Sequence, residues 1–178
     1  MRGAIRVLVV GATAGLVAGE VMDKATTWYY GRQSDASKAR EQELLPEGAP
    51  LAAARRLAGL IGAEPTDDQA GQLALIMHRG LGQGYGVAAA ALTQRGVPPL
   101  AAGVAAGMAG FLVVDELANS LFFTPPPQAY PIESHLRGVV GHLTFGAVTG
   151  LLLALARRLR LLGIASRSAS TSWTTRNT

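Results

Sequence analysis

The chain has 178 residues, of which 49% are apolar and only 16% are charged, so it is more hydrophobic than an ordinary soluble domain. It has no cysteine, which excludes a disulfide framework and a thiolate metal site. Lys and Arg outnumber Asp and Glu by 16 to 12. Because the basic residues are not interleaved with aromatic ones, they fit lipid headgroups better than nucleic acid.

Four segments are almost free of charge and approach the roughly 20 residues that cross a hydrocarbon core about 30 Å thick. They predict an all-α, polytopic membrane protein with four transmembrane helices, over residues 4–29, 70–93, 98–123 and 134–158. Aromatic residues such as Trp28 and Phe122 close the first and third spans, where interfacial belts are expected. A soluble helical bundle is the alternative, because Ala and Gly are only weakly hydrophobic.

The longest connection, residues 31–68, is predicted to hold two short helices instead of a structureless loop. Ser34 is the expected cap of a polar helix that runs to Leu45, where Pro and Gly residues follow. Residues 51–61 have an amphipathic pattern and could lie on the membrane surface or cover the bundle. Thr66, with Gln three residues later, has the spacing of a capping box for the second span.

The two halves of the chain share a pattern of small and ionisable residues. In the first and third spans glycines step every fourth position and end on an acid: Gly11, Gly15, Gly19 and Asp23, then Gly103, Gly107 and Asp115, with Phe111 in the place of Gly19. The second and fourth spans carry H-x-x-x-G-x-x-x-G: His78, Gly82 and Gly86, then His142, Gly146 and Gly150. A duplication would make the fold two parallel helical hairpins, related by a pseudo-two-fold axis along the membrane normal.

The glycine stripes are expected to be packing surfaces. Small residues let helix backbones approach closely, and this is a common way for membrane helices to associate. We expect most of these contacts to form within the chain. The alternative is that the grooves bind a transmembrane helix of a partner or of a second copy, which would make the protein a scaffold, an accessory subunit or a homo-oligomer.

The ionisable residues near the ends of the stripes form the candidate polar site. A charged side chain at mid-span costs roughly 2.5–3.5 kcal/mol on insertion scales, so these residues should face inward or toward water. The candidates are Asp23, Asp115, His78, His142, Glu20 and Glu116. Histidine beside carboxylates can sense pH or pass protons, whereas an ion-pair network that fixes the helices is the simpler alternative.

No reactive constellation is visible, so we expect a protein that is not an enzyme. His135 and His142 share a helical face, but no H-E-x-x-H or other close-spaced ligand motif accompanies them, and no metal is predicted. The glycine run 80–86 lacks the lysine and Ser/Thr of a phosphate loop. No cofactor or nucleic acid is expected, and the predicted partner is the lipid bilayer.

Charge is distributed unequally between the two ends of the predicted bundle. All 12 acidic residues lie in, or near the same end of, the segments that join spans one to two and three to four. The opposite end carries Arg2, Arg6, Arg95, Arg157, Arg158 and Arg160. The positive-inside rule therefore predicts that both termini are cytoplasmic. Residues 164–178, rich in Ser and Thr, are predicted to be a disordered tail.

The arrangement resembles the YagU-like bacterial inner-membrane proteins, a family classed as a domain of unknown function. The similar features are the glycine-rich first helix with polar residues at its end, the amphipathic segment from Pro50 to Gly62, and the stretch from His78 to Gly86. They cover about two-thirds of the chain, and none is a catalytic motif. The resemblance implies an integral protein of the bacterial inner membrane, in a family linked to acid resistance. With the polar site, it leads us to expect a role in proton or envelope homeostasis.

Overall fold

The computed structural model describes residues 2–162, and the regular structure in this part of the chain is entirely helical. The long helices are α1 (Arg2–Tyr30), α4 (Asp67–Gln94) and α7 (Ile132–Arg158). A further long rod joins α5 (Pro99–Gly110), the π-helix η1 (Phe111–Ala118) and α6 (Asn119–Phe122). The predicted tail, 164–178, lies outside the described residues.

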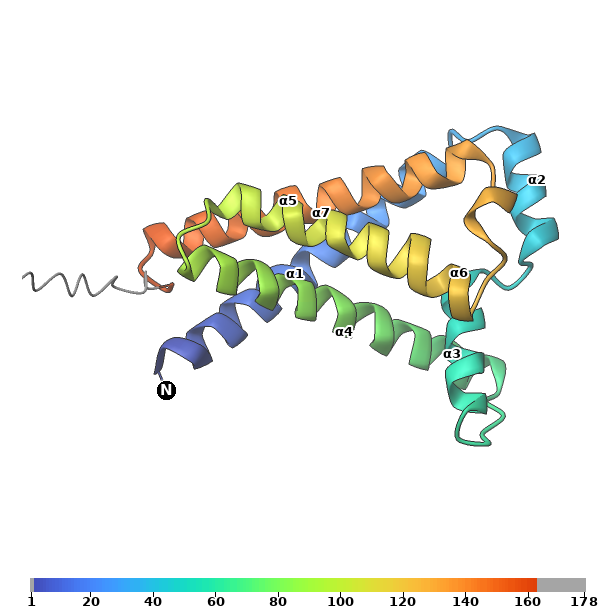
Figure 1. The fold of residues 1–178 in the computed structure, drawn as a ribbon, viewed down its shortest axis with the longest axis horizontal. Helices are drawn as coiled ribbons and strands as arrows, with labels where there is room; N and C mark the ends of the chain where they lie inside the picture. The colour runs from blue at the N-terminus through green and yellow to red at the C-terminus, as the bar shows by residue number, and fades with distance from the viewer. Residues whose placement is uncertain (1, 163–178) are drawn as a thin grey trace, which may run out of the picture.

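The four long rods pack in a ring, in which α1 and α5 each contact both α4 and α7 (Figure 1). α1 and α5 run in one direction, and α4 and α7 run in the other (Figure 1). The start of α1, the turn from α4 to α5 and the end of α7 therefore share one end of the bundle. The short helices α2 (Asp35–Leu44), α3 (Ala49–Gly59) and η2 (Pro127–Ala129) gather at the opposite end, beside α6.

Three of these rods, Gly3–Tyr30, Pro99–Phe122 and Ile132–Arg158, are long and apolar enough to cross a membrane. They indicate a multi-pass membrane protein, and their bounds agree closely with the predicted spans 4–29, 98–123 and 134–158. The segment predicted as the second span, 70–93, lies within the continuous helix α4. α4 is not among the three helices that meet this criterion, so a fourth span stays a prediction.

Glycines lie where α1 crosses α4. A Cβ atom built on Gly11 would lie 2.6 Å from Cα of Val87, and one built on Gly86 would lie 2.7 Å from Cα of Gly15. Real Cβ atoms do not approach so closely, so a larger residue here would force the backbones apart. Gly19 differs, because no atom lies within 4 Å of its built Cβ.

The crossing of α5 and α7 uses the matching glycines of the second half. A Cβ on Gly103 would lie 2.6 Å from the backbone nitrogen of Gly150, and one on Gly146 would lie 2.7 Å from Cα of Val104. The core around both crossings is built from small side chains, among them Ala14, Ala89, Ala90, Ala102 and Ala106. At both glycine crossings the helices are therefore held by close backbone approach.

Both short helices expected in the long connection are present. α2 begins after Ser34, whose hydroxyl accepts a hydrogen bond from the backbone N–H of Ser37, and α4 begins with the predicted capping box of Thr66 and Gln69. α3 buries its alanines and packs against α4. The segment 51–61 therefore covers the bundle, but with its alanines. Leu57, Leu60 and Ile61, which the amphipathic pattern predicted on the apolar face, are exposed.

Candidate functional site

Each hairpin pairs the histidine of one helix with the aspartate of the other. Nε2 of His142 on α7 lies 3.1 Å from Oδ2 of Asp115 on η1, and the two form a hydrogen bond. Nε2 of His78 on α4 also lies 3.1 Å from Oδ1 of Asp23 on α1. In this second pair the nitrogen is not aligned for a hydrogen bond. Equivalent positions of the two halves are thus brought together, with different geometry.

The two pairs also differ in burial. The side chains of His142 and Asp115 are 12% and 39% exposed, whereas those of His78 and Asp23 are 40% and 53% exposed. Where α1 has Gly19, the second half has the buried Phe111, whose ring centroid lies 5.9 Å from that of His142. The helix changes from α to π at Phe111 and stays π through Ala118, and π segments within α-helices are frequent at functional sites.

The remaining predicted acids, Glu20 and Glu116, also contact basic side chains of other helices. Glu20 on α1 lies 3.1 Å from Arg79 on α4, and both side chains are about half exposed. Oε1 of Glu116 lies 2.7 Å from Nδ1 of His135, whose Nε2 lies 3.0 Å from the carbonyl oxygen of Pro127. His135 therefore links η1 to the loop before α7.

A cavity of about 560 Å³ lies at the α2 end of the bundle. Asp115, Glu116, His78 and His135 line it, so it contains half of the predicted polar site together with a histidine considered only as a metal ligand. A smaller cavity of about 80 Å³ is lined by His78, Asp115 and His142 and brings the histidines of both hairpins to one space. Asp23 and Glu20 line neither of these two cavities.

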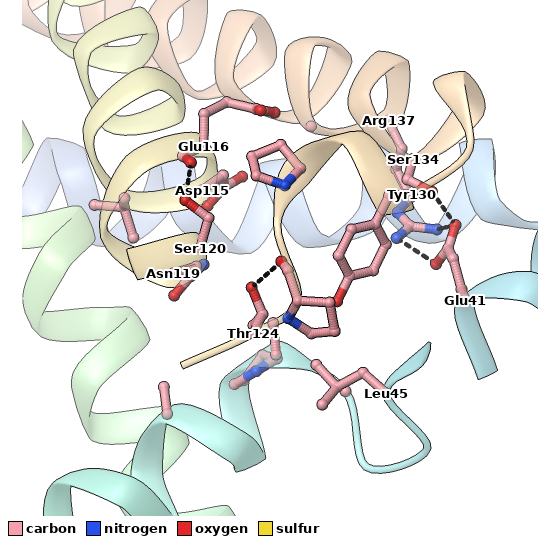
Figure 2. A pocket seen from close by; sticks show the side chains of 18 of the residues that line it. Glu41, Leu45, Asp115, Glu116, Asn119, Ser120, Thr124, Tyr130, Ser134 and Arg137 are labelled. Carbon is pink, nitrogen blue, oxygen red and sulfur yellow. Dashed lines mark hydrogen bonds and ion pairs between the residues drawn. The ribbon is translucent and has the colours of Figure 1, made fainter. Parts of the chain in front are cut away.

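One wall of the larger cavity is formed by Glu41 on α2. The sequence patterns did not predict Glu41 as a site residue. Arg137 of α7 donates to Glu41 over 2.7 Å, and Ser134 donates to it over 2.6 Å (Figure 2). Gln33 also donates to Glu41. Burial raises the pKa of Glu41, but these hydrogen bonds outweigh burial and hold that pKa below its ordinary value. α2 is thereby fixed on α7 by a charged pair.

The opposite wall comes from η1 and α6, which present Asp115, Glu116, Asn119 and Ser120 (Figure 2). Tyr130 lines the cavity from the loop before α7, and burial raises the pKa of its phenol. Among residues 2–162, no three His, Asp or Glu side chains converge as a metal ion would require. Histidines placed beside carboxylates, as in this arrangement, can bind and release protons.

Comparison with protein-family models, with curated proteins and with solved structures found no match to this chain. The resemblance to the YagU-like proteins therefore stays a prediction.

Proposed function

We propose that the chain is a non-enzymatic, four-span protein of the bacterial inner membrane that senses or conducts protons and so serves proton or envelope homeostasis. One observation carries the proposal: each hairpin places a histidine 3.1 Å from an aspartate across its helix contact, and His78 and His142 line one small cavity. Histidine changes its charge near physiological pH, so a change of pH alters the charge at these contacts.

The fourth span is supported by topology. α1 and α5 run in the same direction, so a chain that crosses the membrane in α1 must cross back before α5 begins (Figure 1). α4 is the helix that makes this connection, and its 28 residues would span about 42 Å at about 1.5 Å per residue. We therefore propose that α4 is a span whose Arg79 and His78 are accommodated by pairing with α1.

The cytoplasmic placement of both termini rests on charge. Arg6, Arg95 and Arg157 belong to the end of the bundle where α1 begins, α4 turns into α5 and α7 ends. α2 and α3, with the acidic residues of the long connection, lie at the other end. Positive residues close to the ends of spans favour the cytoplasmic side.

The glycine arrangement favours this function over the scaffold alternative. Gly11, Gly15 and Gly86 already meet backbone atoms within the chain, as do Gly103 and Gly146. A partner helix bound to these faces would have to displace one of the chain's own helices. The variants Gly82→Leu and Gly146→Leu would therefore disturb the packing of the chain's own helices, so a loss of partner binding in them would not identify a partner-binding groove.

The test is proton movement in vesicles that contain the purified chain and a pH-sensitive dye. Wild-type protein should give a proton flux, or a pH-dependent change of conformation, that the replacement of His78 and His142 by Gln reduces strongly. The variant Glu43→Gln, on the exposed face of α2, is a matched control and should behave as wild type. A response that survives the double histidine replacement would remove the proposal.

A further inference from the structure

We propose that the larger cavity binds an amphipathic organic cation, a substituted ammonium with an apolar body. This inference rests on the proposed function, because it assigns a ligand class to the same polar chamber. At about 560 Å³ the cavity has the size of small-molecule sites. Apolar side chains form part of its walls, and polar side chains, among them carboxylates, histidines and hydroxyls, form much of the rest.

The sign of the ligand follows from the carboxylates. Asp115 uses Oδ2 toward His142, and Glu116 uses Oε1 toward His135. The hydrogen bonds within residues 2–162 leave Oδ1 of Asp115 and Oε2 of Glu116 without a donor. Both side chains line the cavity from adjacent positions on η1. An ammonium group placed beside them would supply the donors, or the charge, that these oxygens lack.

The cavity offers no comparable site for an anion. Arg137 is the one arginine among its lining residues, and it is bound to Glu41 and Gln33. Its planar guanidinium also lies 5.1 Å from the ring centroid of Tyr30. An anion could bind Arg137 only if the partly buried pair of Arg137 and Glu41 broke. This would leave Glu41 with an uncompensated charge, which is unfavourable.

The remaining walls fit the apolar body of the ligand. Leu45, Met77, Leu81, Phe111 and Val114 line the cavity from α4, η1 and the end of α2. Methionine adapts its shape to different ligands, and aromatic faces attract cations. Tyr130 adds an aromatic ring from the loop before α7 (Figure 2).

Protons and the cation should compete, because both reduce the negative charge of Asp115 and Glu116. The other titratable or charged groups that line the cavity are Glu41, Glu47, His78, His135, Arg137, Tyr30 and Tyr130. Lower pH neutralises the carboxylates and adds positive charge to the histidines. Both changes oppose a bound cation, so its affinity should fall as the pH falls.

The test uses the purified full chain in a nonionic detergent and titration calorimetry with benzylammonium, whose N–H groups can donate to both carboxylates. Phenylmethanesulfonate, of similar shape and opposite charge, is the control ligand. We expect the cation to bind at least about tenfold more tightly than the anion, because one hydrogen bond between charged groups contributes about that factor in affinity. The double variant Asp115→Asn, Glu116→Gln should lose about tenfold or more in affinity for the cation. Glu43→Gln should not change it.

Equal affinity for the two ions, or unchanged cation binding by the double variant, would overturn the inference. If the double variant does not fold, the wild-type chain can still test the inference. Its affinity for the cation should decrease from about pH 8 to about pH 5, a range that includes the ordinary histidine pKa of about 6.5. An affinity that stays constant over this range would also overturn the inference. The vesicle experiment uses His78 and His142 and no organic cation. Histidine-dependent flux without cation binding therefore removes only this inference, and cation binding without such flux removes only the proton function.

Discussion

His142 and Asp115 form an aligned hydrogen bond of 3.1 Å, whereas the equivalent His78 and Asp23 approach equally closely without one. The helix that carries the acid differs between the two pairs. Asp23 lies in a continuous α-helix, and Asp115 lies in the π-helix η1. Because a π-helix bonds residue i to i+5, it turns less at each residue, and the same sequence spacing directs the side chain differently.

The first prediction is that the two pairs contribute unequally to stability. Double-mutant cycles with alanine at His142 and Asp115 should give a coupling of about 1 kcal/mol, because this hydrogen bond is aligned and partly buried. The cycle at His78 and Asp23 should give about 0–0.5 kcal/mol, as expected for an exposed pair. Denaturant unfolding in nonionic detergent measures both cycles. A larger coupling at His78 and Asp23 would contradict this ranking.

The long helices could be predicted from sequence because they depend on local patterns. Apolar length gave the three candidate spans to within about two residues, and the four-residue glycine steps indicated where helices cross. Gly19 shows the limit of that pattern, since it continues the stripe but no atom lies within 4 Å of its built Cβ. At Gly19 no neighbouring backbone lies close enough to require a glycine.

The second wall of the larger cavity could not be predicted in this way. Glu41 is separated from Ser134 by 93 residues and from Arg137 by 96, and no local pattern links them. The π-helix was equally hidden, because the sequence of η1, FLVVDELA, contains no Pro or Gly and reads as ordinary α-helix. The Glu41 contacts depend on how α7 packs against α2.

The second prediction concerns the glycine crossing of α1 and α4. Gly15→Ala should destabilise the fold by about 1–3 kcal/mol, because the new Cβ overlaps the backbone of Gly82 and outweighs the helix propensity of alanine. Gly84→Ala is the matched control, since no atom lies within 4 Å of its built Cβ; it should stabilise the helix by up to about 1 kcal/mol. Thermal unfolding in detergent separates the two, and similar effects would argue against the observed crossing.

The third prediction concerns acid stability. The folded-state pKa of Glu41 lies below its ordinary value of 4.5, because hydrogen bonds from Arg137, Ser134 and Gln33 outweigh the effect of burial. The stability from this group is therefore present above that ordinary value and is lost as the pH falls through the folded pKa. Glu41→Gln should be less stable at neutral pH, by about 1.5–3 kcal/mol, and should lose less stability on acidification. A pH series of denaturant unfolding measures this, and parallel curves for variant and wild type would contradict it.

The fourth prediction concerns the loop before α7. His135 contacts Glu116 and the carbonyl oxygen of Pro127, so His135→Phe keeps a ring but removes both contacts. The amides of Ala129 and Tyr130, which bond within this loop, should then exchange with solvent faster. Hydrogen exchange followed by mass spectrometry measures the change. Leu136→Ala, on the exposed neighbouring position, should leave these amides as protected as in wild type.

The last prediction tests whether Phe111 holds the π-helix against α7. Its side chain is 7% exposed, and a Cβ on Gly138 would lie 2.7 Å from its ring. Phe111→Ala should cost about 3–5 kcal/mol, because it removes a buried ring and leaves a cavity next to His142. Phe122→Ala, where the side chain is 62% exposed, is the control and should change stability by no more than about 0.5 kcal/mol. Equal losses for the two variants would mean that Phe111 does not hold η1 against α7.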